Sequence, residues 1–156
     1  MSKKPVLLAA PPDIIRWSPR SRGHGDCTIA ALELACGVTY ESALAAALAH
    51  DPDVLRTGML LKHVCGAATL LGYKTTLHRV YNLEEDTGIL SVRQPRHKGS
   101  DHVVYLWEGR IIEPMDERRQ LWLSADQFLK HYRYTHDALI GIEPLPEETH
   151  GTTDRR

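Results

Sequence analysis

A cysteine at the start of a predicted helix, Cys27, is the residue of this chain best placed for chemistry. It follows the polar, glycine-rich segment 23–26 and opens the apolar run CTIAALELAC, which is followed by Gly37. Asp26 has a side chain typical of helix N-caps, and glycine commonly ends helices. The unpaired N–H groups and the dipole of a first helical turn stabilise a thiolate, and the same N–H groups bind oxyanions. This placement favours Cys27 as a nucleophile.

The other two cysteines indicate packing rather than reactivity. Cys36 and Cys65 both lie inside apolar helical patterns, where a free cysteine behaves as a small hydrophobic residue. That interpretation also stands as the alternative for Cys27. Three cysteines cannot all pair and none belongs to a CxxC motif, which favours free thiols in a reduced, cytoplasmic compartment.

A cysteine nucleophile needs a base, and the base needs an orienting group. Of nine histidines, His102 is favoured because it begins the strand-like run HVVYLW, which turns at Glu108-Gly109 and returns over residues 110–113. A two-residue hairpin loop pairs Val104 with Glu113. Strand alternation then puts His102 and Glu113 on one face as diagonal neighbours, about 7–8 Å apart at Cα. The hairpin therefore predicts a carboxylate within reach of the imidazole.

Two other carboxylates near this hairpin are less well placed. Asp116 falls on the opposite face in this register, and Asp101 alternates away from His102. A one-residue bulge would reverse the assignment, because it changes the face of every later side chain. Each residue also has a simpler interpretation when it is considered alone. His102 could be a histidine at a strand end that bonds to the backbone, and Glu113 an ordinary solvated residue at a strand end. Together with Cys27 they predict a Cys-His-Glu triad.

Two segments of the chain resemble a known family. GDCTIAALELACGVTYESAL, residues 25–44, looks like the nucleophile helix of papain-like cysteine peptidases, closest to the bacteriocin-processing, or double-glycine, peptidase domains and their phage and bacterial relatives. DHVVYLWEGRIIEP, residues 101–114, resembles the hairpin that carries their histidine, and LLGYKT, residues 70–75, resembles the end of their intervening helix. The resemblance covers about residues 22–142. It implies a papain-like fold with Cys27 as nucleophile and His102 as general base.

The sequence departs from that family at two positions. Glu113 stands where the family usually has aspartate, which keeps the carboxylate on an arm longer by one methylene. The family also carries a glutamine about six residues before the cysteine to complete the oxyanion hole, but this position is Ser21 and no glutamine precedes Cys27. Loss of one such donor costs about 10²–10³ in rate. The candidate replacement donors beside the Cys27 N–H are Ser21, Arg22, His24 and Trp17.

Three functions are consistent with these residues. The leading hypothesis is a thiol hydrolase that cleaves a peptide, isopeptide or related acyl bond of a peptide or protein substrate, without metal or organic cofactor. The second is a catalytically weak or inactive papain-like module with a binding or structural role, for example in a phage particle, favoured by the missing glutamine. The third is a zinc site built on His24 and Cys27 with His97 or His102, although structural zinc sites usually show tighter paired spacings.

Composition limits the remaining classes. The chain has 156 residues, 19 basic and 20 acidic, for a formal net charge of −1. This length predicts one domain, and the charge balance argues against nucleic-acid binding through bulk electrostatics. No apolar run approaches the roughly 20 residues that span a bilayer, and the run at residues 6–10 is shorter than the apolar core of a signal peptide. We therefore expect a cytoplasmic protein.

The order of predicted elements indicates an α+β fold, with N-terminal helices packed on an antiparallel sheet. Helices are predicted over residues 27–36, 40–49 capped by Thr39, 59–71 capped by Thr57 and stopped by Gly72, and 123–132 with a capping box at Ser124. Strands are predicted over residues 73–80, 89–93, 102–107, 110–113 and 138–142. The predicted organisation is an irregular segment 1–21, a papain-like peptidase domain 22–143 and a flexible tail 144–156.

Overall fold

The computed structural model describes residues 7–9, 26–57, 59–95, 102–113 and 120–146. Helices and strands alternate little along the chain, as in an α+β fold. The helices are α1 (Asp26–Cys36), α2 (Tyr40–His50), α3 (Val54–Thr57), α4 (Leu61–Leu70) and α5 (Ala125–Tyr132). The strands are β1 (Leu7–Ala9), β2 (Tyr73–His78), β3 (Thr87–Arg93), β4 (His102–Trp107), β5 (Arg110–Ile112), β6 (Gln120–Trp122) and β7 (Thr135–Pro144).

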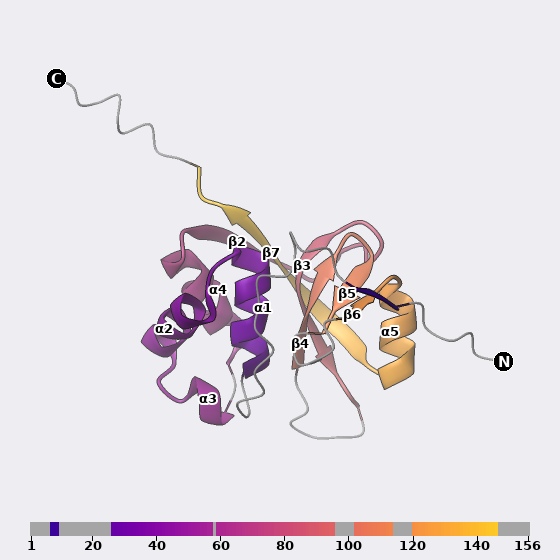
Figure 1. The fold of residues 1–156 in the computed structure, drawn as a ribbon, viewed down its shortest axis with the longest axis horizontal. Helices are drawn as coiled ribbons and strands as arrows, with labels where there is room; N and C mark the ends of the chain where they lie inside the picture. The colour runs from indigo at the N-terminus through magenta and orange to yellow at the C-terminus, as the bar shows by residue number, and fades with distance from the viewer. Residues whose placement is uncertain (1–6, 10–25, 58, 96–101, 114–119, 147–156) are drawn as a thin grey trace.

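The strands form one antiparallel sheet in the order β1-β6-β5-β4-β3-β7-β2. Helices α1, α2 and α4 gather on one side of it, and α5 lies on the other (Figure 1). The predicted α+β arrangement, with N-terminal helices against an antiparallel sheet, is therefore observed. Strand β4, which begins at His102, has three strands on each side in that order.

Helix α1 is enclosed by the rest of the molecule. It packs against β4, β3 and β7 on one side and against α2 and α4 on the other (Figure 1). Its residues Ile29, Ala31 and Leu32 are fully buried, and even Glu33 is only 2% exposed. A helix that is apolar all round is typical of a protein core. The sequence following Cys27 is thus apolar because α1 has almost no solvent-facing side.

The sheet separates two apolar clusters, because successive side chains of a strand point to opposite faces. On β3, Ile89 packs with α1, α2 and α4, whereas Leu90 packs with Phe128 of α5. On β4, Val103 belongs to the helix-covered cluster and Val104 to the α5 cluster. This alternation fixes the strand register, since a slip of one residue would exchange the two buried faces.

Most predicted helix ends are confirmed. The N–H of Gly37, at φ +63°, donates to the Glu33 carbonyl over 2.8 Å and ends α1. The side chain of Thr39 accepts from the N–H of Ser42 at the start of α2. At the start of α5, the hydroxyl of Ser124 accepts from the Gln127 N–H over 3.2 Å.

The prediction for the third helix is wrong at its start. Thr57 does not cap α4, because it is the last residue of α3, a short helix that the sequence pattern did not predict. Helix α4 begins at Leu61, and its N-cap, Leu60, makes no side-chain hydrogen bond. A helix that starts without a capping side chain carries no N-terminal signal in the sequence.

The strand predictions also need correction at their ends. Strands β3 and β7 begin earlier than predicted, β7 continues to Pro144, and β2 ends at His78. The segment 1–21, expected to be irregular, contributes the strand β1, which pairs with β6; neither strand was predicted. Both are three residues long, too short for alternation to distinguish them from loop.

The β4–β5 hairpin has the predicted register. Tyr105 pairs with Ile112, and Trp107 with Arg110. The two loop residues, Glu108 and Gly109, have φ values of +47° and +85°. Positive φ at both loop positions matches the twist of two-residue hairpins and favours glycine. The register shift in this part of the sheet lies instead between β3 and β7, at Ser91/Val92, so it leaves the faces of β4 and β5 unchanged.

Within the described ranges, no single helix is long and apolar enough to cross a membrane. Helices α1 and α2 meet the length and composition criteria only as a pair, and that pair is bent by 119° at its break.

A close backbone approach in the sheet predicts the effect of two alanine substitutions. A Cβ at Gly88 would lie 2.2 Å from the Ile140 carbonyl oxygen, a backbone atom that cannot move aside alone. We expect Gly88→Ala to lower the free energy of unfolding by about 2–3 kcal/mol, measured by urea unfolding with tryptophan fluorescence. In the matched variant Gly141→Ala, the nearest atoms belong to the flexible ring of His78, at 3.2 Å, and the Thr76 carbonyl oxygen lies at an ordinary contact distance of 3.7 Å, so the cost should be less than about 0.5 kcal/mol. Equal costs for the two variants would contradict this packing.

Candidate active site

The hairpin brings His102 and Glu113 together as its register requires. His102 is the first residue of β4, and Glu113 directly follows the last residue of β5. The His102 Nε2 atom lies 2.8 Å from Glu113 Oε1 and 3.0 Å from Oε2. The two side chains are only 17% and 12% exposed. A histidine and a carboxylate are therefore paired in a largely water-excluded position.

This contact fixes the roles of the two ring nitrogens. An ionised carboxylate only accepts hydrogen bonds, so Nε2 carries a hydrogen and donates a hydrogen bond to Glu113. Nδ1 is then the ring atom available to a second partner. The orientation is the one a general base needs, because the carboxylate holds the tautomer and supports the positive charge when Nδ1 gains a proton.

The second partner is Cys27, in the first turn of α1. The packing of α1 against β4 brings this turn to the start of the strand, and the Cys27 side chain is within hydrogen-bonding reach of the His102 imidazole. Cys27 is partly exposed, whereas residues 28–34, which follow it in α1, are all buried. It therefore combines the helix terminus, a nearby base and access from outside.

Opposing effects act on the charge of His102. Burial lowers the pKa of this imidazole, but the hydrogen bonds to Cys27 and Glu113, together with the negative charges of these groups, raise it from 6.5 to about 10. The imidazolium form is thus favoured at neutral pH. An imidazolium between a thiol group and a carboxylate stabilises the thiolate electrostatically.

The structure adds an aromatic residue that the sequence pattern did not identify. The ring of Tyr134, between α5 and β7, lies 6.2 Å from that of His102 between centroids, with 31° between their planes. Burial raises the pKa of Tyr134 to about 12, and the charges of Glu113, Tyr132 and Cys27 add to the effect. The sequence contains only a weak signal for this neighbour, the pair of tyrosines at 132 and 134 just before a predicted strand.

Several residues considered from the sequence lie outside the described ranges. They include all four candidate oxyanion donors other than the Cys27 backbone, namely Trp17, Ser21, Arg22 and His24. The alternative carboxylates Asp101 and Asp116, and the histidine His97 of the zinc hypothesis, also fall outside them. Their assignments stay predictions.

The remaining cysteines differ from each other. Cys36 is 3% exposed, as expected for a core thiol, and burial raises its pKa to about 12. Cys65 was expected in the core too, but it is partly exposed and packs at the edge of the cluster around α1. The α4 face that carries it borders the core rather than filling it, which makes Cys65 a useful control thiol.

The described residues offer no group of three or more His, Cys, Asp or Glu side chains that could hold a metal ion. The predicted site of His24 and Cys27 with His97 or His102 involves residues beyond the described part. The hydrogen bond of His102 Nε2 to Glu113 leaves Nδ1 as the ring nitrogen for such a site.

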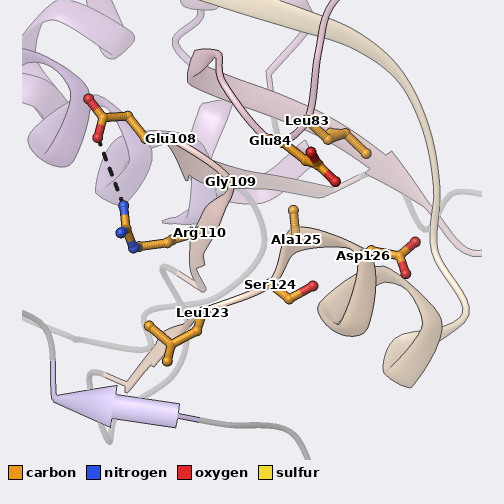
Figure 2. Close-up of a pocket in the computed structure, with 9 residues that line it drawn as sticks. All are labelled: Leu83, Glu84, Glu108, Gly109, Arg110, Leu123, Ser124, Ala125 and Asp126. Atoms are coloured by element: carbon orange, nitrogen blue, oxygen red, sulfur yellow. Dashed lines mark ion pairs between the residues drawn. The ribbon is translucent and has the colours of Figure 1, made fainter.

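A cavity of about 530 Å³ lies elsewhere in the molecule (Figure 2). It sits at the Glu108-Gly109 turn and is bordered by Ser124 and Asp126 at the start of α5. The turn and His102 are at opposite ends of β4, about 17 Å apart at the usual rise per residue. The cavity is bordered by Arg110, which forms a 3.8 Å ion pair with Glu108, and the described residues that line it include no cysteine or histidine. It is separate from the cysteine–histidine site.

Comparisons with known proteins found no match for this chain. No protein-family model matches the chain, and no match was found among curated proteins or solved structures.

The charge state of His102 gives a direct prediction. With a pKa of about 10, its ring should stay protonated at pH 8, where an ordinary histidine is neutral. Proton–carbon NMR of the histidine rings checks this, with the signal assigned from the spectrum of His102→Gln. In Glu113→Gln the midpoint should fall by at least about one pH unit, because the carboxylate charge is removed.

The exposed pair of Asp126 and Lys130 supplies the control for that experiment. Its oxygen and nitrogen lie 2.8 Å apart on α5, with side chains 68% and 78% exposed. Asp126→Asn should leave the His102 midpoint unchanged, since surface charges are screened by solvent. A wild-type midpoint near 6.5 would contradict the assigned environment of the ring.

Proposed function

We propose that the chain is a thiol hydrolase of papain-like type that cleaves a peptide, isopeptide or related acyl bond. The observation that carries the proposal is the largely buried hydrogen bond of His102 Nε2 to Glu113, 2.8 Å long, with the Cys27 side chain within hydrogen-bonding reach of the same imidazole. A nucleophile, a base and an orienting carboxylate are the minimum for this chemistry. No metal or organic cofactor takes part in it.

The reaction uses each side chain in a definite role. Cys27 Sγ attacks the carbonyl carbon, forming a C–S bond while the π electrons move to oxygen. The Cys27 N–H at the start of α1 is a donor for this oxyanion. His102 gives its proton to the leaving amine or alcohol as the acyl–thioester forms. Water, deprotonated by His102, then hydrolyses the thioester and restores the thiol.

Glu113 acts through His102 rather than on the substrate. Because its carboxylate accepts from Nε2, Nδ1 is the ring nitrogen left to take or return the proton of the thiol. The longer arm of glutamate relative to aspartate is compatible with this role, since both carboxylate oxygens lie within 3.0 Å of Nε2. Glu113 is therefore assigned as a positioning residue.

The resemblance to papain-like peptidases supports the same proposal independently of the distances. The helix that carries the cysteine as its second residue lies against a strand that begins with the histidine, in the order and spacing of the two resembling segments. We propose on this basis a papain-like fold for the domain and a peptide or protein as substrate. A reduced compartment such as the cytoplasm suits a nucleophilic thiol.

A digestion experiment tests the proposal on many peptide sequences at once. The protein is incubated under reducing conditions with a complex peptide mixture, and new termini are identified by mass spectrometry. We expect cleavage by the wild type, and a loss of at least about 10³-fold in Cys27→Ala and in His102→Ala. Cys65→Ala, which removes another partly exposed thiol, should cleave like the wild type.

Two outcomes contradict the hydrolase. Cleavage that persists in Cys27→Ala would show a contaminant or a different nucleophile. No cleavage or acyl transfer by the folded wild type would leave the inactive binding or structural module as the better account.

A further inference from the structure

Tyr134 is held beside the candidate active site by local backbone structure. The preceding residue, Arg133, ends α5 in the left-handed conformation, at φ 56° and ψ 41°. The turn brings the Tyr134 N–H to within 2.8 Å of the Leu129 carbonyl, to which it donates. Non-glycine residues adopt this conformation at an energetic cost, so surrounding contacts must fix it.

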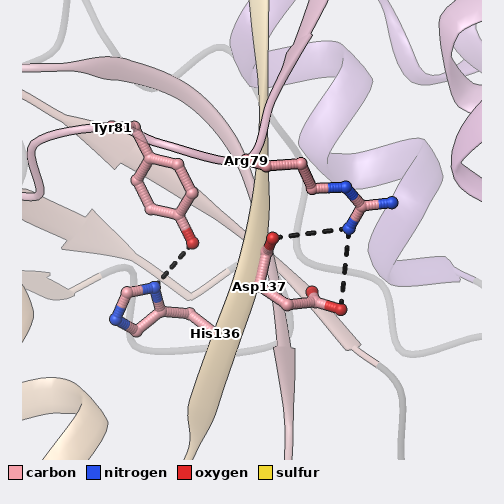
Figure 3. A network of polar contacts seen from close by, with 4 residues as sticks. All are labelled: Arg79, Tyr81, His136 and Asp137. Atoms are coloured by element: carbon pink, nitrogen blue, oxygen red, sulfur yellow. Dashed lines mark hydrogen bonds and ion pairs between the residues drawn. The ribbon is translucent and has the colours of Figure 1, made fainter.

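Contacts from β3 and from the segment after β2 provide that fixation. The side-chain amide of Gln94 donates to the Tyr132 carbonyl over 3.1 Å. Two residues beyond Tyr134, the ring of His136 meets the Tyr81 hydroxyl through Nδ1 at 2.6 Å (Figure 3). The neighbouring pair of Arg79 and Asp137 spans the same two segments at 3.8 Å. Tyr134 thus sits between two anchored backbone positions rather than on a free loop end.

The ring of Tyr134 joins an aromatic cluster on one side and the imidazole on the other. It lies 5.8 Å from Phe128 and 5.7 Å from Tyr132 between centroids, and 6.2 Å from His102. The aromatic cluster fixes the position of the ring. The ring thus lies between this aromatic cluster and the candidate site.

The hydroxyl has the properties of a hydrogen-bond donor reserved for a ligand. Its pKa of about 12 keeps the phenol protonated over the working pH range. Its ring lies 6.2 Å from that of His102, and burial, followed by the charges of Glu113, Tyr132 and Cys27, raises the pKa of the phenol. Among the described residues, none accepts a hydrogen bond from it.

We propose that the Tyr134 hydroxyl donates a hydrogen bond to the oxyanion formed when Cys27 attacks a substrate carbonyl. The inference rests on the proposed hydrolase function and deepens it by naming a second donor beside the Cys27 N–H. As the C–S bond forms, the carbonyl oxygen gains the π electron pair and accepts from both donors. The phenol keeps its proton throughout, and the proton for the leaving group comes from His102.

The test compares two reactions of the same thiol. Alkylation by iodoacetamide reports thiolate reactivity and forms no oxyanion. Acylation by p-nitrophenyl acetate passes through an oxyanion and releases a coloured product. We expect Tyr134→Phe, which keeps the ring, to slow Cys27 acylation by about 10²-fold while changing alkylation by less than about twofold. Tyr132→Phe is the matched control and should leave both rates unchanged.

Each alternative result has a distinct meaning. Equal slowing of both reactions in Tyr134→Phe would assign the residue to the thiolate instead of the oxyanion and overturn the inference. If Tyr134→Phe is acylated at the wild-type rate and only Tyr134→Leu is slower, the ring has a packing role alone and the inference is overturned as well. In either case, an acylation rate above that of Cys27→Ala leaves the proposed hydrolase function standing. Wild-type acylation no faster than that of Cys27→Ala removes the hydrolase and the inference together.

Discussion

The largely buried hydrogen bond between His102 and Glu113 is the interaction on which the site depends. Removing a carboxylate from water is costly, and the cost is tolerable only with a close, well-oriented partner. Here that partner is an imidazole whose pKa is lowered by burial but raised overall by the hydrogen bonds and charges of Cys27 and Glu113. The hairpin register makes the pairing possible, because His102 and Glu113 lie on the same face of neighbouring strands.

The rest of the architecture brings a nucleophile to this pair. Helix α1 is enclosed between the sheet and the helices α2 and α4, so its position relative to β4 is fixed by packing on all sides. Its first turn carries the partly exposed Cys27 next to His102, although the two residues are far apart in the sequence. An apolar helix enclosed on all sides is thus both a core element and the support of the candidate site.

The parts of this arrangement that follow short-range rules could be predicted from the sequence. The Glu108-Gly109 loop and the period-two pattern of β4 fix the hairpin register, and with it the meeting of His102 and Glu113. Gly37 and Ser124 mark helix ends because their backbone and side chain satisfy terminal groups locally. These features depend on residues within a few positions of each other.

The parts that depend on distant pairing could not be predicted. Strand β1 exists through its partner β6, more than 100 residues away, and neither carries enough residues to show a pattern. Tyr134 reaches His102 only because β7 pairs with β3, and β3 with β4. Helix α4 starts without a capping side chain, so nothing local marks its first residue. In each case the determining contact lies outside the sequence window that a pattern covers.

The reactivity of Cys27 as a function of pH tests the central claim most directly, because it measures whether the imidazolium and the thiolate form a pair. The rate of iodoacetamide alkylation is followed from pH 5 to 11 in the wild type and in His102→Ala, with the modified residue identified by mass spectrometry. At pH 6 the wild type should react at least about tenfold faster than the variant. The two rates should converge near and above pH 10, where His102 loses its proton. Coincident profiles over the whole range would contradict the account, since His102 would then have no influence on the thiol.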